Sequence, residues 1–348
     1  MEQTCEKALL VGNGINRAFS DADYSWENLL QDLSKLGTGS INLSNPYKPF
    51  PLAFEEILST KGNSYNEAIR VLKEKTAEIF GKIPVRETHR MIANCTKYRN
   101  VLTTNYEYTL ENAYAEKLNH HSDFREVCNN ARSTNEEIHS LFRKYEFADE
   151  QFSVWHIHGE INDTKYSNAK VIIPSNSILI GYSQYVSYLD TIYRYLFTDR
   201  KLQATPISSL HKKMSTYKNK PENAIMESWV DFFFFKDIDI IGLTLDFSEM
   251  HLWWILNRRF SLRKDSDIFS KKQDVKASFR PNNAITYHYP VLSSNSRKVV
   301  CSGASIPDKQ QAIVNMLDVL GVKTKKHRCK TYEDFYTMVL GNGLIAEK

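Results

Sequence analysis

The chain has few of the residues that build small cross-linked folds. It has five cysteines in 348 residues, and no two of them form a C-x-x-C pair. An odd, scattered set of cysteines does not make a disulfide framework, and it cannot supply a zinc ribbon. The pattern is typical of a protein from a reducing compartment. The five positions are Cys5, Cys95, Cys128, Cys301 and Cys329.

Long apolar runs and a large excess of one charge are absent too. No window approaches the roughly 20 apolar residues of a membrane span, so we expect a soluble, cytoplasmic protein with no membrane contact. Lysine and arginine number 45 against 41 acidic residues, a formal charge of +4, so direct nucleic-acid binding is not expected. Basic runs at 258–264 and 323–330 are read either as solvated surface or as a patch for an acidic partner.

Short apolar segments alternate with helical periodicities along the chain. KALLV at 7–11 predicts a buried strand, and WENLLQDLSKLG at 26–37 predicts a helix capped by Ser25 and ended by Gly37. The order of segments predicts an α/β fold, with a Rossmann-like, mainly parallel sheet and helices on both faces. We expect one domain over 1–348 with helical insertions near 38–97, 119–150 and 182–235, a strand at 170–175 and an exposed loop at 199–221.

Four short motifs follow predicted strands, and the first is VGNGINR at 11–17. Gly12 and Gly14 suit either a structural turn or a backbone approach to a phosphate, although a third glycine of the dinucleotide fingerprint is missing. The amides of Asn13 and Asn16 favour the second interpretation, because they can bond ribose or phosphate oxygens.

The second motif, TTN at 103–105, ends a short strand. Asn105 either caps a helix that begins at Tyr106 or presents its amide to a water or a ribose hydroxyl. The fourth motif, IIGLTLDFSEM at 240–250, is either a turn and cap or a second anion contact at Gly242 and Thr244.

The third motif is FSVWHIHGEI at 152–161, with two histidines flanking one apolar residue. His156 and His158 share a strand face, but no acidic or cysteine ligand lies at metal-binding spacing near them, so no metal is expected. His251 and His288 lie far away in sequence, and only the fold could bring them close.

In this order the four motifs resemble the sirtuin-like NAD-binding fold over roughly residues 7 to 260, and specifically the SIR2-like domains of bacterial antiphage systems. GNGIN stands where sirtuins have G-A-G-x-S, TTN stands for T-Q-N, and His158 with Gly159 matches the H-G pair. DYSWENLL is similar to the P-S-W-x-x-L-L element of the bacterial group. The resemblance makes Asn105 and His158 catalytic. It implies NAD contacts at Gly12, Asn13, Gly14, Asn16, Thr104, Glu107, Gly159, Gly242 and Thr244.

Three departures set this chain apart from deacylating sirtuins. The four-cysteine zinc ribbon is missing, and Glu107 replaces the family's aspartate while Asn13 replaces an alanine. The resemblance therefore implies hydrolysis of NAD by water that Asn105 positions, with His158 binding or deprotonating the ribose hydroxyls or that water.

The expected role is that of an NAD glycohydrolase acting as the effector of abortive infection. Expected partners are NAD, further copies of the chain in a homo-oligomer, and a HerA-type ATPase, an Argonaute-like protein or another defence-system protein. Segment 182–235 is the candidate assembly surface. Two alternatives remain open: a silent subunit that senses NAD or ADP-ribose, and a nucleic-acid-binding subunit.

Overall fold

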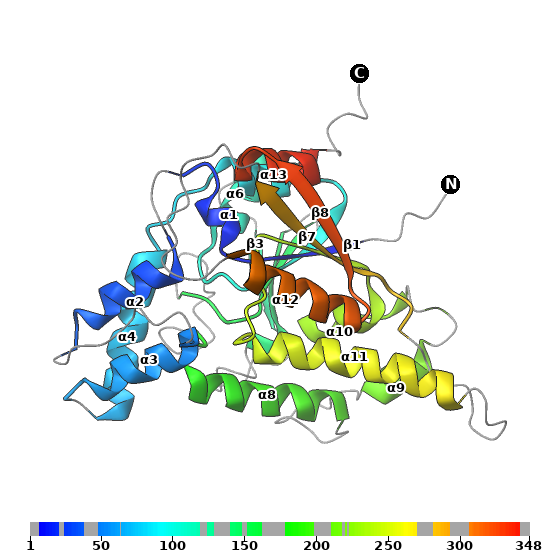
Figure 1. Cartoon of the computed structure of the whole chain (residues 1–348), viewed down its shortest axis with the longest axis horizontal. Helices are drawn as coiled ribbons and strands as arrows, with labels where there is room; N and C mark the ends of the chain where they lie inside the picture. The colour runs from blue at the N-terminus through cyan, green and yellow to red at the C-terminus, as the bar shows by residue number, and fades with distance from the viewer. Residues whose placement is uncertain are drawn as a thin grey trace.

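Eight strands form one sheet in the part of the chain that the structure, a computed structural model, describes (Figure 1). That part comprises residues 7–20, 24–37, 48–62, 64–118, 124–128, 140–147, 152–161, 178–197, 210–217, 220, 223–269, 281–292 and 306–341. The strands are β1 (Lys7–Val11), β2 (Tyr98–Thr103), β3 (Phe124–Cys128), β4 (Arg143–Phe147), β5 (Ser153–His156), β6 (Ile238–Ile241), β7 (Ile285–Leu292) and β8 (Lys323–Cys329).

The strand order is β3-β4-β5-β2-β1-β6-β7-β8. The run from β5 to β8 is parallel throughout, while β3 and β4 add an antiparallel hairpin at one end. The chain therefore starts in the middle of the sheet at β1 and builds outward in both directions. Such a reversal of strand order is where α/β sheets bind ligands, beyond the carboxyl ends of the strands. The α/β, Rossmann-like class predicted from sequence is confirmed.

Side chains of the central strands alternate between two cores. In β1, Ala8 and Leu10 point into one buried cluster, and Leu9 and Val11 point into the other. This is the two-residue period of a strand whose two faces are both covered.

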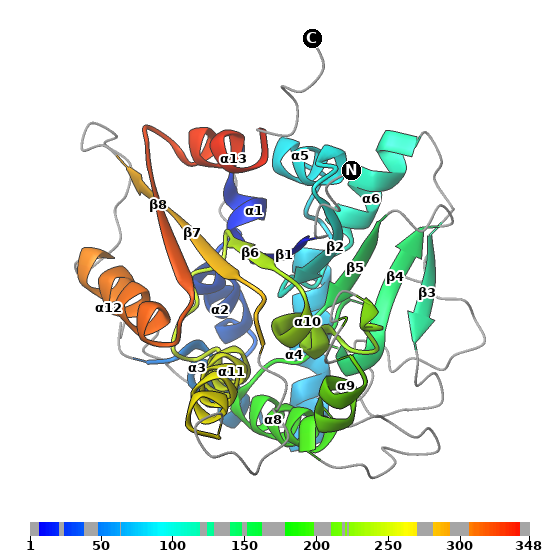
Figure 2. The same ribbon diagram turned by 90° about the vertical axis from the view of Figure 1, so that its right-hand side faces the viewer.

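Helices cover both faces (Figure 2). One face carries α1 (Gly14–Arg17), α5 (Glu87–Asn94), α6 (Thr109–Leu118) and α13 (Tyr332–Leu340). The other carries α8 (Tyr182–Phe197), α9 (Leu210–Thr216), α10 (Trp229–Phe235), α11 (Met250–Phe269) and α12 (Ile306–Val319). All seven residues of α10 are buried, so its four phenylalanines belong to the core and not to an exposed surface.

A third group of helices packs beyond the edge of the strands. It consists of α2 (Trp26–Ser34), α3 (Phe50–Ser59) and α4 (Tyr65–Phe80). Their apolar sides form a separate core with Tyr106 and Tyr108, the residues on either side of Glu107. Ser25 caps α2 as predicted, because its Oγ accepts a hydrogen bond from the Asn28 backbone N–H (3.3 Å).

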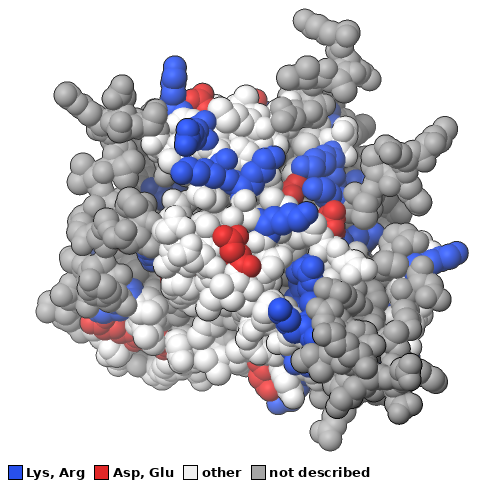
Figure 3. All heavy atoms as spheres, turned by 45° about the vertical axis from the view of Figure 1, so that its right-hand side comes forward, with Lys and Arg blue, Asp and Glu red and all other residues white. Residues whose placement is uncertain are grey.

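Four segments differ from their sequence-based interpretation or lie outside the described residues. Residues 124–128 and 143–147, expected within a helical insertion at 119–150, form the β3–β4 hairpin. The basic run at 323–330 contains β8, whose side chains are mostly charged and exposed, so it lacked an apolar signal. Lysine and arginine side chains gather on the face that Figure 3 shows. The strand expected at 170–175 lies outside the described residues. So does most of the exposed loop expected at 199–221, but its residues 210–216 form α9, whose Leu210 and Met214 are buried, so this part is not an exposed loop.

The longest described helix, α11, includes several charged residues, among them Arg258, Arg259 and Arg263. Over the residues that the structure describes, no helix has both the length and the hydropathy that crossing a bilayer requires.

Candidate active site

Four loops meet at the carboxyl edge of the sheet, one from each of the neighbouring strands β1, β2, β5 and β6. Backbone hydrogen bonds extend the strand pairing into these loops. Thr104 N–H donates to the Val11 carbonyl (3.1 Å), and Ile157 N–H donates to the Thr103 carbonyl (2.8 Å). The structure therefore brings all four sequence motifs to one edge, where parallel sheets bind ligands.

The two glycine turns, at 12–14 and at 242, are in close contact. Gly14 N–H donates to the Gly242 carbonyl (2.8 Å), and a Cβ on Gly14 would lie 2.7 Å from that oxygen. Gly242 has φ +62°, and a Cβ there would lie 2.6 Å from the Tyr336 hydroxyl. Both conformation and space therefore require glycine at 242. Leu245, with φ +52°, adds a second left-handed residue to the same turn.

The side chains of Asn13 and Asn16 bond within the protein. Asn13 Nδ2 donates to the Tyr24 carbonyl (2.5 Å). Asn16 Nδ2 donates to Asn13 Oδ1 (3.0 Å) and to Glu107 Oε1 (2.8 Å). Asn16 is fully buried, so its amide fixes the first glycine turn to the loop that carries Glu107.

His89 of α5 completes this buried network. Its Nδ1 accepts from the Arg86 backbone N–H (2.8 Å), so in the neutral ring Nε2 carries the hydrogen and donates to Asn16 Oδ1 (2.9 Å). Burial, together with the charges of Arg86 and Arg90, lowers the pKa of His89 to about 3, which keeps the ring neutral. Burial also raises the pKa of Glu107, against the hydrogen bond from Asn16.

Asn105 differs from Asn16, although both are buried. Its side chain is 4% exposed, and neither Oδ1 nor Nδ2 has a hydrogen-bond partner among the described residues. Its backbone is fixed, since Asn105 N–H donates to Thr103 Oγ1 (3.0 Å). The expectation that a helix begins at Tyr106 was wrong, because α6 begins at Thr109 and residues 104–108 form a loop. Asn105 therefore does not cap a helix.

His156 contacts the backbone of the loop that carries Asn105. Its Nδ1 lies 2.9 Å from the Asn105 carbonyl oxygen, and its Nε2 lies 2.8 Å from Glu111 Oε1. All three residues are buried. The carbonyl oxygen can only accept, so Nδ1–H donates to it, and Nε2 faces the Glu111 carboxylate.

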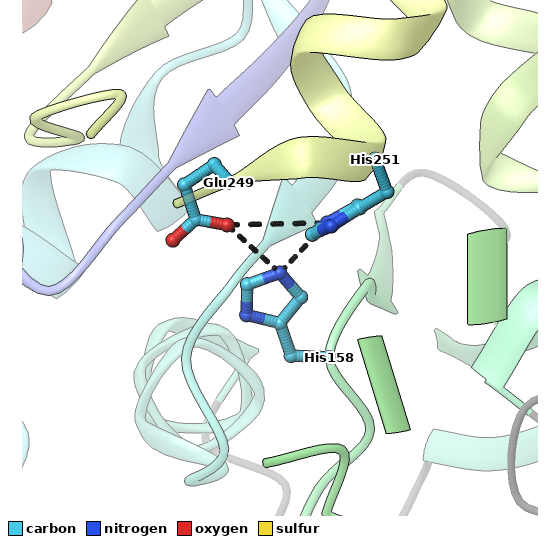
Figure 4. Close-up of side chains that lie close together, drawn as sticks. All are labelled: His158, Glu249 and His251. Carbon is cyan, nitrogen blue, oxygen red and sulfur yellow. Dashed lines mark hydrogen bonds and ion pairs between the residues drawn. The ribbon is translucent and has the colours of Figure 1, made fainter. Parts of the chain in front are cut away.

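His158 lies beyond the end of β5 and faces the start of α11. Its Nε2 is 2.8 Å from His251 Nε2 and 3.3 Å from Glu249 Oε2, and Figure 4 shows the three side chains converging. The Nδ1 atom of His158 points away from the other two and has no partner in the described part of the chain. Tyr185 packs against both imidazoles, with ring centroids 5.3 Å from His158 and 5.6 Å from His251.

The site residues named from the sequence do not all occupy equivalent places. Most of them are buried: Gly12, Asn13, Asn16, Thr104, Asn105, Glu107, His158 and Gly159. Two glycines, Gly14 and Gly242, are partly covered, and Thr244 is exposed. Sequence reasoning did not assign roles to His89, Glu111, Glu249 or His251. Because 93 positions separate His158 from His251, no local spacing could have paired them.

A mainly parallel sheet with glycine turns and polar groups at its carboxyl edge is an arrangement that nucleotide-binding α/β proteins use. Residues 99–212 match the family model of the SIR2-like domain. The match confirms the resemblance to the sirtuin-like family over this segment. The segment contains Asn105 and His158, and NAD-related function is what the family indicates. A search of curated proteins found no match.

Proposed function

We propose that this chain is an NAD glycohydrolase that cleaves NAD to nicotinamide and ADP-ribose. The observation that carries the proposal is the buried, unpaired amide of Asn105. An amide buried without hydrogen bonds costs about 1–3 kcal/mol, so folded proteins retain such a group where a ligand or a reaction uses it. The unpaired Nδ1 of His158, on the adjacent strand's loop, supports the same interpretation.

In the proposed reaction, the bond between nicotinamide and ribose breaks and its electron pair leaves with nicotinamide. Positive charge then develops on the ribose, and a water oxygen forms the new bond at the same carbon. Asn105 orients that water through its amide, and the Nδ1 lone pair of His158 accepts the proton that the water loses. The balance is NAD plus water to nicotinamide, ADP-ribose and one proton.

Glu249 and His251 keep His158 in the tautomer that this role needs. A hydrogen on His158 Nε2 is directed to His251 Nε2 and Glu249 Oε2, which leaves Nδ1 as the free base. The carboxylate also stabilises the imidazolium that forms during the step, as a base is commonly oriented by a third group.

The test is incubation of the purified chain with NAD while nicotinamide and ADP-ribose are followed. We expect release of both products in equal amounts, and loss of release in Asn105→Ala and in His158→Ala. Tight NAD binding without products would instead identify a sensing subunit. If NAD hydrolysis survives both substitutions, the active site lies elsewhere in the chain.

The wider role we propose is that of an effector in antiphage abortive infection, controlled by homo-oligomerisation or by a partner such as a HerA-type ATPase. It is supported only by the resemblance to SIR2-like defence proteins. The test is phage challenge of bacteria that express the wild-type chain or Asn105→Ala. We expect cellular NAD to fall and phage yield to drop only with the wild type. Equal phage yields with both chains would contradict the role.

A further inference from the structure

We infer that His158, Glu249 and His251 form a binding site for a divalent transition-metal ion of the Zn²⁺ type, and that its occupation stops NAD hydrolysis. The inhibitory part of this inference rests on the proposed function, whereas the metal site rests on geometry alone. Each residue offers one ligand atom, and the three atoms lie within 4.8 Å of one another. Two imidazoles and a carboxylate are a donor set that zinc accepts.

The distances are close to those that a bound ion requires. With Zn–N bonds of about 2.0–2.1 Å and tetrahedral angles, neighbouring ligand atoms lie roughly 3.3 Å apart. His158 Nε2 and Glu249 Oε2 are 3.3 Å apart already. The two Nε2 atoms must separate from 2.8 Å, and Glu249 Oε2 must approach His251 Nε2 from 4.0 Å. The first distance must grow by about 0.5 Å and the second must shrink by about 0.7 Å, and small rotations of the side chains accomplish both changes.

The surroundings favour a defined site over a chance cluster. His251 is fully buried, and His158 is 1% exposed. The aromatic rings of Tyr185, Tyr188 and Trp229 surround His251, so its orientation is fixed by packing. Glu249, whose side chain is 17% exposed, is the ligand on the solvent side. Three protein ligands leave the fourth position of a tetrahedral ion open, as in zinc sites that admit a small molecule.

Metal binding would change what His158 offers to the substrate. A neutral imidazole that coordinates through Nε2 carries its hydrogen on Nδ1. Nδ1 is then a donor, so the lone pair that accepts the proton of the attacking water is lost. An ion at this site therefore inhibits hydrolysis even though it leaves Asn105 untouched.

The experiment uses the full chain after treatment with a chelator. Zn²⁺ binding is measured by calorimetry without NAD, and Co²⁺ is used as a visible probe, because four-coordinate Co²⁺ absorbs strongly. We expect one ion per chain. Glu249→Gln and His251→Asn should each weaken binding by about 10–100-fold. The matched control is His327→Asn, which removes one imidazole of the pair His288–His327 (3.0 Å) on β7 and β8, and it should bind as the wild type does.

Activity is then measured as the ion is added. We expect NAD hydrolysis to fall in proportion to occupancy and to return when the chelator is restored. The inference is overturned if the wild type binds no stoichiometric ion, if His327→Asn weakens binding as much as His251→Asn does, or if hydrolysis persists at full occupancy. A chain that binds the ion but never hydrolyses NAD would contradict the proposed function and the inhibition, while the metal site would stand.

Discussion

The loops after β1 and β6 differ from the loops after β2 and β5, although all four lie at one edge of the sheet. Around Gly12, Gly14 and Gly242 the backbone and the asparagine side chains bond within the protein. Around Asn105 and His158 the backbone is fixed, but side-chain polar atoms are left unpaired. In the proposed function, the first pair of loops would form a rigid base for NAD, and the second pair would keep hydrogen-bonding groups for the reaction.

The largest effect is expected from Asn105→Ala. NAD hydrolysis should fall about 10²–10⁴-fold, because the water loses the group that orients it. The thermal midpoint should stay the same or rise, since a buried unpaired amide is removed. Nicotinamide release and a melting curve measure the two quantities. Asn257→Ala, at an exposed position on α11, is the control and should change neither. Unfolding of Asn105→Ala would assign Asn105 to the scaffold.

Gly242→Ala tests the close contact between the two glycine turns, after β1 and after β6. The added Cβ would meet the Tyr336 hydroxyl at 2.6 Å with the backbone at φ +62°, so we expect a loss of about 2–3 kcal/mol in the free energy of unfolding. Urea denaturation measures it. Gly62→Ala, where a Cβ would meet nothing within 4 Å, should stay within about 0.5 kcal/mol of the wild type. Similar losses in both variants would contradict the close approach of the turns.

Asn16→Ala should cost about 1–3 kcal/mol of stability, because Glu107 Oε1 and His89 Nε2 each lose a buried partner. The loss should appear in urea denaturation in the absence of NAD. Asn16→Asp keeps the acceptor for His89 but places a carboxylate beside Glu107, so it should also destabilise. A variant with wild-type stability and impaired NAD binding would instead make Asn16 a direct NAD contact.

The network around His89 also predicts a dependence on pH. The pKa of His89 is about 3 in the folded chain against 6.5 for the free side chain, so between these values the unfolded chain binds the extra proton. Stability attributable to His89 is therefore complete above pH 6.5, and it falls by about 1 kcal/mol per pH unit below that. Urea denaturation at pH 6.5 and pH 5 should show a smaller decline in His89→Gln. Equal declines would show that His89 is protonated in the folded chain.

The smallest effect is expected at Thr244, the exposed residue among those expected to contact NAD. Thr244→Ala should leave stability within about 0.5 kcal/mol of the wild type. If its hydroxyl bonds NAD, KM should rise about three- to tenfold with kcat unchanged, as for the loss of one hydrogen bond. Steady-state kinetics over a range of NAD concentrations measures this. An unchanged KM would restrict the second glycine turn to its structural role.

Sequence reasoning located the four loops because each motif follows a strand, and parallel strands bring their carboxyl ends together. It could not predict which of the polar side chains in these loops form hydrogen bonds within the protein. Asn16 and Asn105 are the same residue type after similar strands, and only the position of His89 and Glu107 separates their roles. The contact of His158 with Glu249 and His251 depends on how α11 packs, which no local pattern encodes. The sequence did not predict a strand at β8, because most of its side chains are charged and not apolar.

The exposed lysines of β8 also bear on how copies of this chain could meet. β8 is the outermost strand at its end of the described sheet, so it presents backbone groups that another strand could pair with. Lys323, Lys325, Lys326 and Arg328 are exposed along it. Two copies joined edge to edge would bring like charges into register, which deters aggregation through open strands. Self-association through the β8 edge is therefore disfavoured, and raising the salt concentration would weaken this protection.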